Sequence, residues 1–291
     1  MMKNNNPSVK CNPVIIPAPL AGWTDYGFRS VLIACGAREV WTEMINATAL
    51  ARGNAKTIAM LKTDKVDGVH QVVQLFGREP ADFVTVIQSG LLDAYDEINL
   101  NMGCPAPKIV KNHCGCALMR DLPRAQNLIT LCHQALNHKH QKLSVKFRLG
   151  WDKNIAEEFA TMCVGVGAER LIVHGRLGVD GYRGTADYHA IAQVKAAVNV
   201  PVIANGDVRD RASYKHCLAT THADGVMVGR ALCGAPWKIG LDDSVPSYER
   251  IVELMQLQRQ RHNGNPNDLI KHWLCYQKQL KKYYPDRPIP Q

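Results

Sequence analysis

The 291-residue chain lacks the features that mark several large classes of protein. No apolar run approaches the ~18 residues that a membrane-spanning helix needs. The first residues, Met1 to Asn12, are polar and rich in asparagine, without the apolar core of a secretory signal. Hydrophobic residues nevertheless make up 46% of the chain, which is an ordinary globular composition. The sequence therefore predicts a cytoplasmic globular protein with no membrane attachment.

The common sequence signatures of nucleotide and metal binding are also missing. Neither a Gly-x-Gly-x-x-Gly nor a Walker sequence occurs, which argues against a Rossmann dinucleotide site. The ten cysteines are scattered, and Cys104, Cys114 and Cys116 do not form the Cys-x2-Cys clips of zinc sites. We therefore expect reduced thiols and no metal.

Acidic residues are in short supply relative to basic ones. The chain has 26 Asp and Glu against 35 Lys and Arg, for a net charge of +9 and a pI near 9.0. A basic surface favours association with polyanions such as nucleic acid, although charge alone is weak evidence.

Short apolar runs recur along the chain and are separated by helix-length segments. The runs are rich in Val, Ile and Leu without polar alternation, as is typical of parallel strands buried on both faces. We expect eight strands: Val14–Ala18, Glu39–Glu43, His70–Phe76, Glu97–Leu100, Leu143–Leu149, Arg170–His174, Pro201–Asn205 and Asp224–Gly229.

Helical patterns between these strands favour an α/β fold, a (β/α)8 TIM barrel, over a doubly wound open sheet. The predicted helices are Glu79–Leu92, Pro123–His138, Ile155–Val166, Asp187–Val198 and Asp210–Thr220. Beyond a linker at Trp237–Pro246, two more helices are expected at Tyr248–His262 and Asn267–Tyr284. We predict a barrel domain over residues 1–240 and a short basic helical domain over residues 241–291.

The predicted strand ends carry polar residues or glycine at nearly every position where a barrel places its active site. Lys146 and Arg148 lie near the end of the fifth strand, and His174 ends the sixth. Two of these residues also have a purely structural interpretation: Lys146 as an ion-paired core lysine, and His174 as a hydrogen-bonded core histidine. Gly206 and Gly229 are turn glycines or allow a phosphate to approach the backbone closely.

Cys104 stands between Gly103 and Pro105, just after a predicted strand, where a thiol is placed to give or take a proton. The stretch Ile98–Pro105, with Lys108 and Gly115–Leu118 behind it, resembles the signature of the tRNA-dihydrouridine synthases. Six supporting motifs follow the same family in order: Ala18–Asp25, Val73–Leu75, Val145–Arg148, Val173–Arg176, Ile203–Asp207 and Met227–Arg230.

This resemblance implies a TIM-barrel enzyme that carries FMN and is reduced by NADPH. Its reduced flavin would reduce the C5–C6 bond of a uridine in tRNA, with Cys104 as the proton donor. Lys146 would stabilise the negative charge of the reduced ring. The implied cofactor contacts are Pro19, Leu20, Ala21, Gln74, Lys146, His174, Asn205, Gly206, Asp207, Gly229 and Arg230.

The resemblance also implies contacts with tRNA, from which the target uracil would be flipped out. Asn101 would reach the uracil, and Lys108, Lys111 and Arg183 are candidates for phosphate contacts. For each of these three residues, an ordinary solvent-exposed charge is as good an interpretation as a phosphate contact. We expect a monomer, since no additional apolar stripe is visible.

The sequence departs from the family at Leu20, where Met is frequent, at Leu177, where Thr is usual, and at Cys116, often Ser. The helical appendage is also short, which leaves the tRNA footprint open. Two alternatives remain: a dihydroorotate dehydrogenase-like enzyme acting on a free pyrimidine, and a non-catalytic RNA-binding barrel.

Overall fold

A computed structural model describes residues 14–240 and 244–290 of the chain. The polar start of the chain and residues 241–243 of the predicted linker lie outside these ranges. Eight parallel strands are present: β1 (Val14–Pro17), β2 (Glu39–Asn46), β3 (His70–Phe76), β4 (Glu97–Met102), β5 (Lys142–Arg148), β6 (Arg170–His174), β7 (Val202–Asn205) and β8 (Gly225–Val228).

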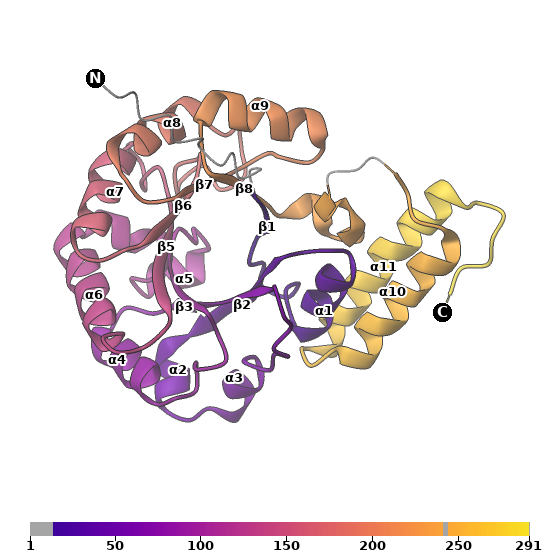
Figure 1. Cartoon of the computed structure of the whole chain (residues 1–291), viewed down its shortest axis with the longest axis horizontal. Coiled ribbons are helices and arrows are strands. Elements are labelled where there is room, and N and C mark those ends of the chain that lie inside the picture. Colours follow the sequence, from indigo (N-terminus) through magenta and orange to yellow (C-terminus); the bar gives the residue numbers. More distant parts are fainter. Residues whose placement is uncertain (1–13, 241–243, 291) are drawn as a thin grey trace, which may run out of the picture.

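The strands form one sheet that curls into a nearly closed barrel (Figure 1). Their order is β1-β8-β7-β6-β5-β4-β3-β2, so from β2 to β8 each strand pairs with the next one in sequence, and β1 pairs with β8. The first and last strands of this order, β1 and β2, also lie against each other. The predicted (β/α)8 barrel is thus confirmed, and the open doubly wound sheet is excluded.

Helices surround the strands in Figure 1, as the alternating pattern predicts. They are α1 (Tyr26–Ala34), α2 (Ala47–Ala51), α3 (Ala55–Ala59), α4 (Pro80–Gln88), α5 (Pro107–Lys111), α6 (Leu122–Ala135), α7 (Ala156–Gly165), α8 (Tyr188–Ala197) and α9 (Arg211–Thr221), with 3-10 turns η1 (Gly115–Arg120), η2 (Arg230–Leu232) and η3 (Pro236–Gly240).

Several elements differ from the sequence-based expectation: β2 continues to Asn46, and helices α2, α3 and α5 were not predicted. The predicted helix Glu79–Leu92 ends early, at Gln88, because Gly90 adopts a left-handed conformation with φ of +83°. Helix α1 was not predicted, although Asp25 caps it by accepting a hydrogen bond from the Phe28 backbone N–H. Its cue was the Asp25 cap followed by an apolar run.

The core has two layers. A large one fills the space between the strands and the helices, and a smaller one fills the barrel itself. The inner layer consists of Ile16, Ala18, Trp41, Val72, Ile172, Ile203 and Met227, packed against Leu20. These side chains make the barrel interior a packed core, as the fold requires, and leave room for chemistry only at its ends.

Helices α10 (Tyr248–Arg261) and α11 (Pro266–Tyr283) stand beside the barrel against α1 (Figure 1). They bury a small core of Ile251, Met255, Tyr276 and Leu280. A Cβ at Gly27 of α1 would lie 2.7 Å from the Gln258 carbonyl oxygen, so only glycine allows α10 this close. Within the described ranges, no helix is long and apolar enough to span a membrane.

Candidate active site

The upper end of the barrel, where the strands end, gathers the chemically active side chains. Cys104 follows β4, Lys146 and Arg148 lie in β5, His174 ends β6 and Asn205 ends β7. Because all eight strands are parallel, their C-terminal ends meet at one end of the barrel, which we call the upper end. The sequence-predicted cluster is therefore present in space as well as in order.

Cys104 sits in a loop that its neighbours hold firmly. The backbone N–H groups of Gly103 and Cys104 donate to Asn101 Oδ1 at 3.2 and 2.9 Å. Burial raises the pKa of the Cys104 thiol, and the nearby charges of Arg148 and Lys146 offset this only in part. The thiol is consequently protonated at neutral pH, as a proton donor must be.

The turn at the start of η1 packs against the backbone of Cys104. Gly115 has φ of +60°, and a Cβ there would lie 2.6 Å from the Cys104 carbonyl oxygen. That carbonyl accepts a hydrogen bond from the Cys116 N–H at 2.9 Å. The Cys116 thiol instead donates to the Gly150 carbonyl, and burial raises its pKa to about 12. Two thiols are therefore close, but they have different surroundings.

Lys146 is a basic residue without a carboxylate partner among the described residues. Its ammonium donates to Asn205 Oδ1 at 3.0 Å, while Asn205 donates to the Met227 carbonyl at 2.9 Å. Desolvation, reinforced by the charge of Arg148, lowers the pKa of Lys146 to about 7. No ion pair to Lys146 exists among the described residues, which argues against the reading as an ion-paired core lysine.

His174 is neutral, and its tautomer follows from its partner. Its Nε2 lies 3.3 Å from Nη1 of Arg176, which can only donate, so Nε2 accepts and the proton resides on Nδ1. Burial lowers the pKa of His174 to about 2, helped by the charges of Lys146, Arg148, Arg176 and Arg230. The histidine thus stands among four cations.

Asp207 is a carboxylate within this cationic group. It accepts two hydrogen bonds from Arg176 Nη2, at 2.7 and 2.6 Å, and one from the Ala186 N–H at 2.8 Å. Arg230 lies 3.3 Å away. The Asp207 side chain is therefore used to join loops after β6, β7 and β8. Gly206 beside it has φ of +135°, with Ala186 too close for a side chain.

The sequence placed Arg148 and Arg176 at strand ends without assigning them a contact, and it did not single out Tyr182. Arg148 Nε donates to the Gly103 carbonyl at 3.0 Å, and its Nη1 donates to the Leu177 and Gly181 carbonyls. It thereby ties the Cys104 loop to the loop after β6. One signal was available, because residues two apart on a strand share a face, which places Arg148 beside Lys146.

Tyr182 lies over this cationic group from the loop after β6. Its ring is 4.8 Å from the Arg230 guanidinium and 5.9 Å from that of Arg148, and it is 59% exposed. An exposed aromatic face at the mouth of a polar site is available to a planar ligand.

The remaining predicted contacts lie at the same end of the barrel. Pro19, Leu20 and Ala21 form the loop after β1, Gln74 and Asn101 are buried, and Gly229 precedes η2. Lys108 and Lys111 are exposed on α5. Arg183 is exposed too, but its Nη2 donates to the Val179 carbonyl, so part of its capacity is already used.

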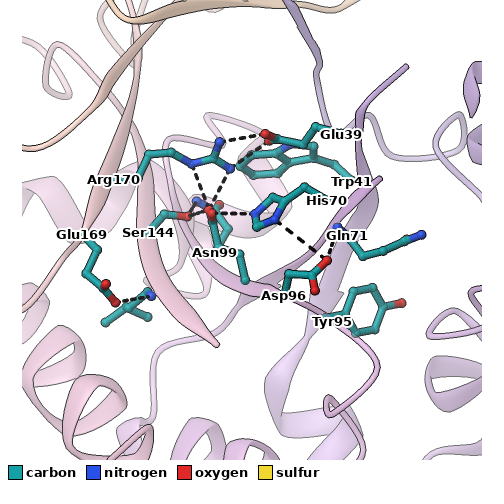
Figure 2. A network of polar contacts seen from close by, with 12 residues as sticks. Glu39, Trp41, His70, Gln71, Tyr95, Asp96, Asn99, Ser144, Glu169 and Arg170 are labelled. Carbon is teal, nitrogen blue, oxygen red and sulfur yellow. Dashed lines mark hydrogen bonds and ion pairs between the residues drawn. The ribbon is translucent and has the colours of Figure 1, made fainter. Parts of the chain in front are cut away.

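The lower end of the barrel has the opposite character (Figure 2). Arg170 donates two hydrogen bonds of 2.8 Å to the Glu39 carboxylate, and its Nη2 lies 2.9 Å from Glu97 Oε1. His70 lies 3.1 Å from Glu97. Although burial opposes ionisation, His70, Arg170 and Ser144 hold the pKa of Glu97 below its usual range. Each of these charged side chains thus has a partner within the protein, which suits a structural role at the lower end of the barrel.

The upper site fits an anionic, hydrogen-bonding ligand. Lys146, Arg148, Arg176 and Arg230 all act on His174, whereas Asp207 is the carboxylate that pairs with this group. Lys146 has three N–H bonds and one protein acceptor, Asn205. Residues 14–240 and 244–290 hold no group of three or more His, Cys, Asp or Glu suited to a metal ion.

Comparison with known proteins places this chain in a family of TIM-barrel proteins. The family model "Dihydrouridine synthase (Dus)" matches residues 16–264. A "Probable tRNA-dihydrouridine synthase" of Rhodobacter capsulatus is 37% identical over 80% of this chain and 71% of its own length. One from Rickettsia bellii is 35% identical over 88% and 80%.

A "tRNA-dihydrouridine synthase B" of Xanthomonas axonopodis pv. citri is 36% identical over 78% of this chain and 68% of its own. Among solved structures, histamine dehydrogenase from Rhizobium sp. 4-9 overlays with a TM-score of 0.61, covering 89% of this chain and 51% of that one. At 11% identity this supports the barrel fold alone. The chain belongs to the dihydrouridine synthase family, as its signature around Cys104 predicts.

Proposed function

We propose that this protein reduces the C5–C6 bond of a uridine in tRNA to dihydrouridine, using FMN that NADPH reduces. The observation that carries the proposal is the protonated Cys104 thiol beside a cluster of four basic side chains, in a member of this family. This arrangement suits a reaction that first adds hydride and then needs a proton.

Flavin would be held by the chain's own donors and by the loop after β1. Pro19, Leu20 and Ala21 would face the ring, and Lys146 would stand at its N1/C2 carbonyl edge. A fixed ammonium there stabilises negative charge on the reduced ring. The loops at Asn205–Asp207 and Gly229–Arg230 would hold the phosphate, as the loops after strands seven and eight commonly do in this fold.

Cys104 would complete the reaction at the uracil. When bound, reduced FMN supplies hydride to C6 of the base. The electron pair of the C5–C6 π bond then moves to C5, which takes the proton of the Cys104 thiol, and solvent reprotonates the thiolate. Arg148 holds this loop through the Gly103 carbonyl, and Asn101 holds it through the Cys104 N–H.

The helical domain after residue 240 would contact the tRNA backbone. Residues 246–291 carry eight basic and four acidic residues. Several are already paired, including Arg287 with Glu249 and Arg261 with Asp64. Lys278, Lys281 and Lys282 of α11 form no ion pair within the described ranges, so they supplement Lys108, Lys111 and Arg183 as phosphate contacts. We propose a cytoplasmic monomer.

The test is mass mapping of tRNA nucleosides from cells that lack this protein. We expect one dihydrouridine to be missing, and to be restored by the parent protein but not by Cys104→Ala. Purified protein should be yellow and should oxidise NADPH in the presence of tRNA. Activity on a free pyrimidine instead of tRNA would establish the dihydroorotate dehydrogenase-like alternative, and a colourless protein would indicate an RNA-binding barrel without redox chemistry.

A further inference from the structure

A chain of hydrogen bonds runs through the barrel from its lower end to Cys104. Glu97, Asn99 and Asn101 are alternate residues of β4, so their side chains share the face that points into the barrel. Gln74 of β3 and Ser144 of β5 complete the chain from the two flanking strands. We call these five residues the polar column: Gln74, Glu97, Asn99, Asn101 and Ser144.

The bonds of the polar column all point in one direction. Asn101 Nδ2 donates to Gln74 Oε1 at 2.9 Å, and Gln74 Nε2 donates to Asn99 Oδ1 at 2.8 Å. Asn99 Nδ2 donates to Ser144 Oγ at 2.7 Å, and that hydroxyl donates to Glu97 Oε1. From Asn101 to Ser144, each residue therefore donates to the next one along the path to Glu97; Figure 2 labels Asn99 and Ser144 of this path.

Both ends of the polar column impose this direction independently. At the bottom, Arg170 and His70 keep Glu97 ionised, and a carboxylate can only accept. At the top, the backbone N–H groups of Gly103 and Cys104 can only donate, so Asn101 must turn its oxygen toward them. The two requirements agree at every amide between them, which fixes how each amide is turned.

One consequence concerns the two amides nearest the active site. The oxygens of Gln74 and Asn101 are engaged within the protein, whereas each nitrogen uses one of its two N–H bonds. In the described part of the chain, neither nitrogen has a second protein partner. Each amide thus keeps one N–H without a protein acceptor in these ranges, at side chains that are 1% (Gln74) and 8% (Asn101) exposed.

We propose that Asn99 and Ser144 are positioning residues, which hold Gln74 and Asn101 so that their N–H groups face acceptors on the pyrimidine-like edge of the bound flavin or on the uracil. This inference rests on the proposed function, because it needs that ligand. A purely structural polar core would stabilise the barrel without setting ligand affinity through Gln74.

The experiment compares Ser144→Ala with Ser144→Thr, which keeps the hydroxyl, and measures FMN affinity by the quenching of flavin fluorescence. Ser144→Ala leaves the Asn99 amide without its acceptor. We expect the dissociation constant for FMN to rise about three- to tenfold, the worth of one hydrogen bond, and the visible flavin spectrum to shift. Ser144→Thr should stay within about twofold.

A double-mutant cycle separates positioning from stability. In a Gln74→Leu background, Ser144→Ala should cause no further loss of FMN affinity, because the amide that it acts through is gone. Asn99→Ala provides a second break in the column if Ser144→Ala does not fold, and should follow the same pattern. Equal losses of affinity in both backgrounds would overturn the inference.

Failure of the inference and failure of the proposed function give different results. If the parent binds FMN and Ser144→Ala binds it equally well, the positioning role is wrong and the proposed function stands. If the parent binds no FMN at all, both are wrong.

Discussion

The two ends of this barrel are built from similar residue types and differ in how charge is balanced. At the lower end, Arg170 faces two carboxylates, Glu39 and Glu97, and every member of the group has a partner. At the upper end, four cations surround His174, with Asp207 as the carboxylate paired to two of them. We therefore expect the lower end to contribute to stability without a ligand, and the unbalanced positive charge of the upper end to favour an anionic ligand.

The largest expected effect separates chemistry from stability. Replacing the thiol in Cys104→Ala should lower the rate of uridine reduction by roughly 10²- to 10⁴-fold, the usual worth of a positioned general acid. Single-turnover measurement with reduced enzyme and tRNA would give this rate, and FMN affinity should be unchanged. Cys114→Ala, a buried thiol outside the site, is the matched control, and an equal loss there would remove the special role of Cys104.

Substitutions at the lower end of the barrel should change the stability of the protein. Arg170→Met removes the guanidinium that contacts both Glu39 and Glu97 and leaves each buried carboxylate only its weaker partners, so the free energy of unfolding should fall by about 3–5 kcal/mol. Denaturant titration measures this value. Adding Glu39→Gln and Glu97→Gln should recover much of the loss, because the buried charges are removed. A loss below about 1 kcal/mol would show that charge matching at this end is unimportant.

The upper end should respond to pH through Lys146. In the free protein the pKa of this lysine is about 7, and an anionic ligand favours its charged form. Binding above pH 7 must therefore take up a proton, and FMN affinity should fall by up to about tenfold per pH unit there. Lys146→Met should bind more weakly and independently of pH, and a flat profile for the parent would contradict the assignment.

The smallest expected effect has the opposite sign. Without ligand, Lys146→Met should stabilise the protein by about 1 kcal/mol, because it removes a desolvated charge. A lysine whose pKa is lowered by folding destabilises most when it is charged in both states. The gain should therefore be largest below pH 7 and fade as pH rises toward 10.5. Thermal unfolding of the free protein at pH 6 and pH 9 would test this trend.

Much of the upper end could be predicted from local sequence. The strand before Cys104 and the strands that carry Lys146 and His174 were identified from apolar runs, and their ends define the site in any parallel barrel. Arg148 was visible but its bonds were not, since they reach carbonyls at Gly103, Leu177 and Gly181. Nothing local tells a guanidinium which loop it will meet.

The lower end was not foreseen. Glu39 and Arg170 are 131 residues apart, and their contact exists only because the barrel brings the starts of β2 and β6 across its floor. The same holds for the appendage. The 2.5 Å contact between Asp25 Oδ2 and His262 Nδ1 and the close approach at Gly27 depend on how α10 docks against α1.

The sequence by itself determined the order of strands, the family signature around Cys104 and the residues that end each strand. Backbone periodicity and short motifs act over a few residues, so they are legible in one dimension. Only the tertiary structure decided which charges are matched, which way the amides of the polar column turn and how Asp207 is engaged. Those properties depend on distances between residues far apart in the chain, and closure of the barrel sets them.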